Sequence, residues 1–315
     1  MTKAAEAFSP AGISSFFEIC DMAADGTSIT ELERVGSRGG GFVLTKGVHT
    51  KVEVSEAKRN KVEVLIDRQL APQAETTRTV AERLLTQTDK KYAVTINHFV
   101  EIPIGAGFGS SAGGALGTAL ALSNALDLNL TYNQLGRIAH VAEVKCKTGL
   151  GTVGPIMLGG CIITVEPGAP GIGVIDRIPL RPDYVVVTGV FGFMPTKQVL
   201  SSADKRQRVS LCGRKTLDAI LAEPTLENFL SSCWSFAEET GFATERVRQL
   251  VKLAKKAGAV NAAQNMIGEA VHAVALEENA DDVAEAFKQV LPKEKVLKSK
   301  IDFQGARLVG THERI

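Results

Sequence analysis

A short segment rich in glycine and serine, PIGAGFGSSAGGA at residues 103–115, constrains the fold of this chain more than any other feature. It follows an alternating stretch, residues 92–102, that is typical of a strand, and it leads into an apolar helix of about 16 residues. Glycines let the backbone approach a ligand closely, and a helix start offers free N–H groups and a positive dipole end. The segment therefore predicts a binding site for a phosphate chain.

The helix that follows the loop carries unusual residues in its first turns. Ser110 and Ser111 bring two hydroxyls to the first turn, where they can cap the helix or reach a Mg²⁺ ion. Gly113, Gly114 and Gly117 stand inside the helix, although each costs about 1 kcal/mol relative to alanine. Such a conflict with local propensity is expected at functional or tightly packed sites. An ordinary glycine-rich turn with close helix packing remains the alternative.

Other phosphate-binding motifs do not fit the sequence. No G-x-x-x-x-G-K-[ST] occurs, and the dinucleotide fingerprint G-x-G-x-x-G fails because Ser110 stands in the place of the third glycine. The stretch IDFQG at 301–305 is not the D-F-G of protein kinases, because no H-R-D precedes it. A dinucleotide-dependent oxidoreductase is therefore disfavoured, and the residues by themselves predict an ATP-dependent enzyme.

Composition excludes several classes of partner. The 36 basic and 35 acidic residues nearly cancel, so we expect neither a nucleic acid nor a membrane as partner. A length of 315 residues with 44% hydrophobic residues predicts two packed domains. The five cysteines are far apart and form no zinc or redox motif. Glu6 and Pro10 interrupt the apolar character of the first residues, which argues against a signal segment. The most apolar window, residues 112–128, is shorter than the about 20 residues that span a membrane. We expect a cytoplasmic protein.

The hydrophobic pattern predicts an α+β organisation. Residues 42–66 read as a hairpin with its turn at Asn60 and Lys61, and Thr131 with Gln134 forms a capping box for a helix that runs to about Cys146. A turn-rich stretch follows the strand at 161–165, and we place a domain boundary near residue 175. The remaining predicted elements are a helix at 74–88, a strand at 184–193 and several amphipathic helices between 215 and 290.

The loop also carries a family resemblance. Its residues read P-x-x-x-G-x-G-S-S-A, which resembles the ATP-binding motif of the GHMP kinase superfamily. Segments across nearly the whole chain resemble its archaeal pantoate kinase family: SPAGISSFFEI (9–19), GSRGGG (36–41), AHVAEV (139–144), TGLGTV (148–153), MPTKQVLS (194–201) and GARLV (305–309). The resemblance implies a GHMP kinase fold, with an N-terminal domain of the ribosomal protein S5 domain 2 type at 1–175 and a ferredoxin-like C-terminal domain at 176–315.

The same resemblance implies ATP and Mg²⁺ as cofactors and gives roles to residues. It makes Ser111 and Glu143 the Mg²⁺ ligands, in line with the need of phosphoryl transfer for a metal held near the phosphates. Without it, a surface pair between Glu143 and Lys147 would be the better interpretation. The ATP-binding residues that it implies are Pro103, Gly105, Ala106, Gly107, Phe108, Gly109, Ser110, Ser111 and Ala112.

The sequence departs from the superfamily pattern at two catalytic positions. Many members have a catalytic aspartate at a position that falls on or near Thr152 here, and mevalonate kinase-like members have a lysine where this chain has Gly12. These departures predict a mechanism without a strong general base, in which an aligned hydroxyl attacks the γ-phosphate. We expect Thr152 to orient the substrate hydroxyl, alongside Ser111 and Glu143 as catalytic residues.

The acceptor that the resemblance implies is (R)-pantoate, phosphorylated to (R)-4-phosphopantoate on the way to coenzyme A. Its carboxylate calls for a guanidinium, for which Arg38 is best placed, with Ser37 beside it and Ser14 or Ser15 in the same cleft. An exposed Arg38 in a flexible turn is the alternative.

His140, three residues before Glu143, can face the ATP site or its rim. The sequence leaves open another acceptor (mevalonate, mevalonate 3-phosphate or homoserine), a non-catalytic nucleotide-binding regulator, and a homodimer.

Overall fold

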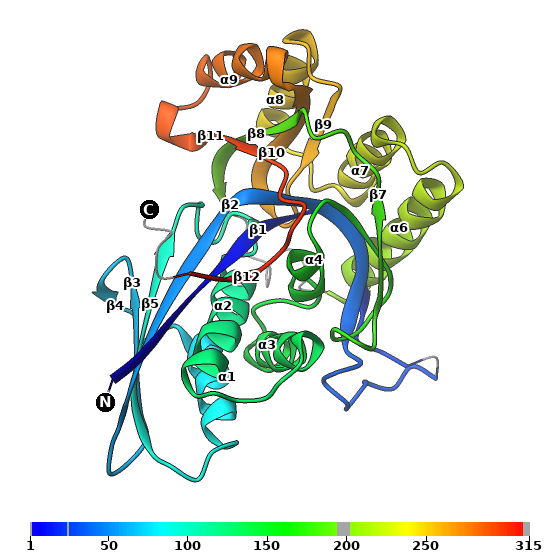
Figure 1. Ribbon diagram of the computed structural model, residues 1–315. Helices are drawn as coiled ribbons and strands as arrows, with labels where there is room; N and C mark the ends of the chain where they lie inside the picture. The colour runs from blue at the N-terminus through cyan, green and yellow to red at the C-terminus, as the bar shows by residue number, and fades with distance from the viewer. Residues whose placement is uncertain (1, 24, 194–201, 311–315) are drawn as a thin grey trace.

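Two long antiparallel strands run through the centre of the first sheet (Figure 1). They are β1 (Thr2–Cys20) and β2 (Gly36–Glu56), and they bend at irregularities in their register between Pro10 and Ala11 and between Ser14 and Phe16. The chain is described here by a computed structural model at residues 2–23, 25–193 and 202–310. The segment MPTKQVLS (194–201), which carries part of the family resemblance, lies outside these residues.

The first sheet is built around these two strands. In the described part of the chain it has eight strands in the order β12-β1-β2-β5-β3-β4, while β6 pairs with β2 and β7 pairs with β6. The other strands are β3 (Lys61–Ile66), β4 (Gln69–Leu70), β5 (Tyr92–Val100), β6 (Cys161–Glu166), β7 (Val174–Ile178) and β12 (Arg307–Val309). The strands predicted at 92–102 and 161–165 are therefore confirmed.

The predicted hairpin at 42–66 is wrong, because β5 lies between its two strands. β5 pairs antiparallel with β2 and parallel with β3. The Asn60 side chain accepts a hydrogen bond from the N–H of Tyr92, at 2.9 Å, so the predicted turn residue binds the start of β5. Helix α1 (Glu75–Leu85) lies between β3 and β5 in the chain, as a parallel pair requires.

Three helices cover one face of this sheet in Figure 1: α1, α2 (Ser110–Ala125) and α3 (Tyr132–Cys146). The predicted length of α2, about 16 residues, and the capping box of Thr131 with Gln134 are confirmed. The glycines inside α2 have a packing reason: a Cβ on Gly117 would lie 2.3 Å from Thr50 Oγ1. Close packing of α2 on the sheet thus overrides helix propensity.

The second sheet has four strands among the described residues, in the order β11-β8-β10-β9. The chain order of one strand, helices, two strands, a helix and one strand is that of a ferredoxin-like unit, which confirms the predicted fold. Its elements are β8 (Tyr184–Phe193), α6 (Ala203–Ala222), α7 (Leu226–Thr240), α8 (Glu245–Lys256), β9 (Asn261–Gln264), β10 (Gly268–Leu276), α9 (Ala280–Lys288) and β11 (Val296–Lys300), with single 3₁₀ turns at Glu277–Asn279 and Lys293–Lys295.

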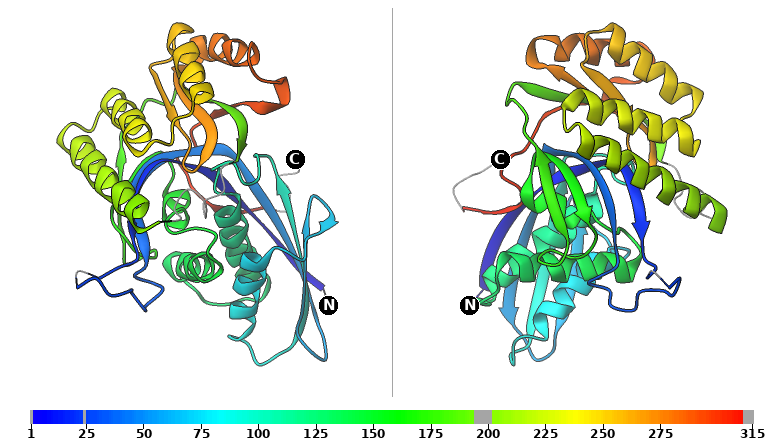
Figure 2. Two further views of the ribbon diagram at one scale, coloured as in Figure 1. Left: turned by 180° about the vertical axis from the view of Figure 1, so that it is seen from behind. Right: turned by 90° about the vertical axis from the view of Figure 1, so that its right-hand side faces the viewer.

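One of the hydrophobic clusters joins the two sheets. Phe16 of β1 and Phe42 of β2 pack against Phe229 of α7, and Figure 2 shows α6 and α7, in yellow-green, beside the long strands. Residue 175 lies inside β7, which belongs to the first sheet. We therefore propose that the domain boundary lies at 179–183, with β12 returning from the second half of the chain to pair with β1.

The buried side chain of His98 makes the free energy of unfolding depend on pH. It is buried between the hydroxyls of Thr50 and Thr77, at 2.9 and 3.0 Å, and burial lowers its pKa from 6.5 to about 4. Between these values the unfolded chain binds a proton that the folded chain does not, so stability falls as the pH falls. We expect His98 to account for a loss of roughly 3 kcal/mol by pH 4.

Urea unfolding of the wild type and of His98→Gln at about pH 7 and about pH 4.5 measures this contribution. Burial also lowers the pKa of His140 and His272, so these residues contribute to the loss of stability as well. The contribution of His98 is therefore the loss of stability in the wild type minus the loss in His98→Gln. An identical loss of stability in both proteins would contradict the assignment.

Candidate active site

The glycine loop has one anchored side and one open side. Gly105, Gly107 and Gly109 have positive φ angles of 78°, 80° and 67°, which favour glycine. Between them, Ala106 and Phe108 are buried at 3% and 1% exposure and fix the loop to the core. Apart from its two chain neighbours, no described residue has a heavy atom within 4 Å of the place a Cβ would take at Gly105, so this side of the loop is open.

The back of the loop packs against two other parts of the chain. The N–H of Gly12 donates to the carbonyl oxygen of Phe108 at 3.2 Å, which ties the loop to β1. A Cβ on Gly107 would lie 3.2 Å from the carbonyl oxygen of Met266, which precedes β10. The open side of the loop, toward the start of α2, is therefore the side that a ligand can approach.

The start of α2 is suited to an anion. Its N-cap residue is Gly109, which has no side chain to cap the helix, and Ser110 and Ser111 occupy the first turn. The first N–H groups of a helix have no partner within it, and they carry the positive end of the helix dipole. Together with the loop, this end can hold the oxygens of a triphosphate.

Ser111 and Glu143 meet at this end of α2. The Ser111 hydroxyl donates to Glu143 Oε1 at 2.6 Å, and Glu143 is 3% exposed. The surface pair of Glu143 with Lys147 is therefore wrong, because the carboxylate points inward from α3. Burial raises the pKa of Glu143, while its hydrogen bonds from Ser111 and Thr148 act in the opposite direction.

Two threonines complete this cluster, and the sequence analysis did not identify them. The Thr148 hydroxyl donates to Glu143 Oε1 at 2.7 Å, and Thr76 Oγ1 lies 3.0 Å from Thr148 Oγ1. All the side-chain donors around Glu143 are thus oxygens, the ligand type that Mg²⁺ prefers. The cluster fits a Mg²⁺ ion held by Ser111 and Glu143. The only signal for Thr148 was its place in TGLGTV, directly after the helix of Glu143.

Thr152 lies directly behind the loop. It precedes α4 (Val153–Leu158), and its Cγ2 atom would lie 2.7 Å from a Cβ on Gly109 and 3.0 Å from one on Gly12. A Cβ on Gly12 would also lie 2.7 Å from Ile156 Cγ2. There is no room at position 12 for the lysine of mevalonate kinase-like members, and the two departures from the superfamily pattern are in contact.

Arg38 is held by acidic side chains. It lies in β2 and is 22% exposed, so its interpretation as an exposed residue of a flexible turn is wrong. Its guanidinium donates to Glu18 Oε2 and to Glu166 Oε2, both at 3.2 Å, and to the carbonyl oxygen of Val165 at 3.0 Å. Arg214 of α6 donates to the other oxygen of Glu18 at 2.6 Å. Glu18 thus joins Arg38 in the first half of the chain to Arg214 in the second.

The serines near the predicted acceptor site differ in their surroundings. Ser37 Oγ would lie 2.2 Å from a Cβ on Gly151, so it borders the turn that leads to Thr152. Ser14 is partly buried, and its carbonyl oxygen accepts a hydrogen bond from the N–H of Met266 at 2.7 Å. Ser15 is fully buried and bonded to His272 Nε2 at 3.0 Å. Ser14 and Ser37 are therefore the better candidates to reach a ligand.

His140 has a structural role. Its Nε2–H donates to the carbonyl oxygen of Val35 at 2.8 Å, and the side chain is buried at 1% exposure. This bond joins α3 to the residue before β2.

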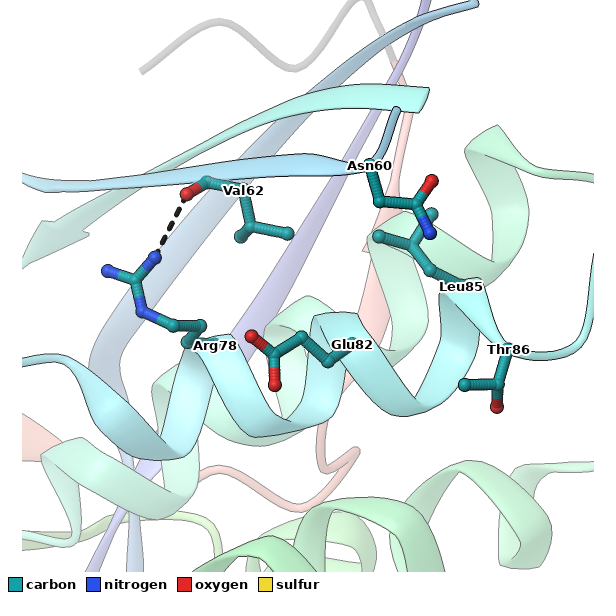
Figure 3. Close-up of a pocket in the computed structure, with 6 residues that line it drawn as sticks. All are labelled: Asn60, Val62, Arg78, Glu82, Leu85 and Thr86. Atoms are coloured by element: carbon teal, nitrogen blue, oxygen red, sulfur yellow. Dashed lines mark hydrogen bonds between the residues drawn. The ribbon is translucent and has the colours of Figure 1, made fainter. Parts of the chain in front are cut away.

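A surface pocket between α1 and β3 is a separate feature (Figure 3). Arg78 donates to the carbonyl oxygen of Val62 there, at 3.0 Å. None of the predicted site residues lines it; its lining residues are Asn60, Val62, Arg78, Glu82, Leu85 and Thr86. Within the residues described above, no helix combines the length and the apolar character needed to cross a membrane.

Comparison with known proteins places this geometry in a family. Residues 75–160 match the GHMP kinases N terminal domain. Pantoate kinase from Thermococcus kodakarensis is 35% identical over 289 residues, which cover 90% of this chain and 91% of that protein. Pantoate kinase from Methanocaldococcus jannaschii is 28% identical and covers 89% of this chain and 96% of that protein.

A solved structure agrees with this assignment. It is described as a phosphotransferase related to the CoA biosynthesis pathway, and it superposes with a TM-score of 0.86 at 30% identity, covering 97% of this chain and 98% of that one. The chain therefore belongs to the GHMP kinases, within them to the family of the archaeal pantoate kinases, and is an ATP-dependent small-molecule kinase.

Proposed function

We propose that the chain transfers the γ-phosphoryl group of ATP to the primary hydroxyl of (R)-pantoate, giving ADP and (R)-4-phosphopantoate. The observation that carries the proposal is the 35% identity to a pantoate kinase over 90% of the chain, together with the open glycine loop at the start of α2. The neighbouring structure described as related to CoA biosynthesis supports a product used in that pathway.

In this proposal the loop and α2 hold the triphosphate. The N–H groups of residues 105–111 and the positive end of α2 face its oxygens, while Ser111 and Glu143 hold Mg²⁺. When bound, Mg²⁺ would neutralise the charge that spreads over the phosphate oxygens. Because the transition state of phosphoryl transfer is loose, the acceptor hydroxyl needs alignment more than a strong base. Thr152, whose methyl group packs beside Gly109, is proposed to align it through its hydroxyl.

The acceptor is proposed to bind beside Ser14, Ser37 and Arg38. Arg38 is already paired, so the substrate carboxylate has to compete with an acidic side chain. Glu166 is the partner that can be displaced, because its side chain is 57% exposed and such pairs contribute little. Glu18, at 7% exposure, stays to orient the guanidinium.

A panel of acceptors tests the proposal. ADP release is measured with (R)-pantoate, mevalonate, mevalonate 3-phosphate and homoserine at equal concentrations of MgATP. We expect turnover with pantoate and at most about 1% of that rate with the others, because a site built for one polar substrate rejects analogues strongly. Turnover with another acceptor alone would replace pantoate in the proposal. ATP binding without turnover on any acceptor would favour the regulator.

A further inference from the structure

We propose that Thr148 is a positioning residue, which fixes the Glu143 carboxylate for metal binding, and that Thr76 fixes Thr148 in turn. The inference rests on the proposed function, in which Glu143 is a metal ligand. Neither threonine is proposed to touch substrate or metal. The hydroxyl groups of the cluster have one proton each to donate, and this limits which hydrogen bonds can form.

The hydroxyl protons in the cluster can be assigned. Glu143 Oε1 accepts two short hydrogen bonds, from Ser111 at 2.6 Å and from Thr148 at 2.7 Å. A hydroxyl has one proton to donate, so the proton of Thr148 is already used. Thr76 Oγ1, at 3.0 Å, must therefore donate to Thr148. A directed chain of hydrogen bonds runs from Thr76 through Thr148 to Glu143.

The backbone holds Thr148 in this place. Lys147 ends α3 in the left-handed conformation, with a φ of 57°, and this turn brings Thr148 back over its own helix. The N–H of Thr148 then donates to the carbonyl oxygen of Glu143 at 3.0 Å. A Cβ on the next residue, Gly149, would lie 2.3 Å from Glu143 Oε2, so the glycine leaves room for the carboxylate in its observed position. Thr148 and Gly149 together enclose the carboxylate.

The two hydroxyls that donate to Glu143, of Ser111 and Thr148, have different roles in the proposed function. Ser111 is itself a proposed ligand, so its hydroxyl must serve the metal as well as the carboxylate. Thr148 has no such second task and can keep Oε1 fixed in both the free and the loaded protein. Partners that orient a metal ligand in this way contribute about 10- to 100-fold to metal affinity or activity.

Substitutions at Thr148 separate the hydroxyl from the shape of the side chain. We expect Thr148→Val to weaken Mn²⁺ binding by about 10- to 100-fold, measured as free Mn²⁺ by electron paramagnetic resonance with a non-hydrolysable ATP analogue present. Thr148→Ser keeps the hydroxyl and should bind Mn²⁺ as the wild type does. Thr76→Val, which acts only through Thr148, should have a smaller effect. Turnover should show the same order in its dependence on Mg²⁺.

Thr240→Val is the matched control. Its hydroxyl bonds the carbonyl oxygen of Phe236 within α7, at 2.7 Å, so it loses a comparable bond away from the cluster. Circular dichroism melting of each variant reports folding. Wild-type Mn²⁺ affinity in a folded Thr148→Val, or equal losses in Thr148→Val and Thr148→Ser, would overturn the inference while leaving an active kinase. An inactive wild type that still binds Mn²⁺ with the analogue would instead overturn the proposed function.

Discussion

Glu143→Gln is expected to lower turnover by more than about 100-fold, because glutamine keeps the shape of the side chain but removes the charge that a metal ligand supplies. The protein should remain as stable as the wild type or become more stable, since burial disfavours the charged carboxylate. Ser111→Ala should lower turnover in the same direction, because it removes the other proposed ligand. Steady-state rates at saturating MgATP and pantoate, with thermal melts, measure both effects.

Glu82→Gln serves as the control for the change in charge. Glu82 is an exposed residue of α1 at the pocket of Figure 3, away from the cluster. It should keep wild-type turnover. If Glu143→Gln kept more than about a tenth of the activity, a metal bound by this carboxylate could not account for the stabilisation of the transition state. The site would then have to be assigned to other oxygens near the loop.

Elements that depend on neighbours in sequence could be predicted without the structure. The helix after the glycine loop, the capping box of Thr131 and the strand at 184–193 all rest on signals within a few residues, and all were confirmed. The pairing of β2 with β5 was not predicted. The turn signal at Asn60 favoured a local hairpin, whereas the pairing that forms joins residues more than thirty positions apart, such as Val52 and Ile96.

The candidate site shows the same limit. A glutamate three residues after a histidine has no pattern that indicates a metal ligand, and only the family resemblance brought Glu143 to Ser111. The partners of Arg38 are Glu18 and Glu166, which come from two other strands, so neither was predicted. A single threonine is too common to stand out, which is why Thr76 and Thr148 were missed.

Gly12 and Thr152 illustrate what distinguishes this chain from its superfamily. Each departs from the pattern of mevalonate kinase-like members, and the two positions face each other behind the loop. A side chain at Gly12 would press against Thr152 and Ile156, so what fits at position 12 depends on the residue at position 152. The small residues bring β1 close to the loop, where the N–H of Gly12 holds Phe108. Closely packed small residues thus stand where the superfamily pattern has a lysine and an aspartate.

Gly109→Ala is expected to raise the dissociation constant for ATP by at least about 10-fold, equivalent to about 1.4 kcal/mol or more. Alanine would have to adopt a φ of 67°, which costs roughly 1–2 kcal/mol. Its Cβ would also lie 2.7 Å from Thr152 Cγ2 and 3.1 Å from the carbonyl oxygen of Gly12. The loop must shift to relieve these contacts, and the N–H groups at the start of α2 shift with it. Calorimetric titration with ATP measures the change.

Two further variants separate the crowding from the backbone strain. Gly241→Ala places alanine at a φ of 75° after α7, where no described residue except the two chain neighbours has a heavy atom within 4 Å of the new Cβ. It should lose only roughly 1–2 kcal/mol of stability and bind ATP as the wild type does. Adding Thr152→Ser to Gly109→Ala removes the clashing methyl group and keeps the hydroxyl, so ATP affinity should partly recover. An unchanged affinity in Gly109→Ala would mean that the triphosphate is not held by this loop, because its N–H groups cannot keep their positions around a side chain there.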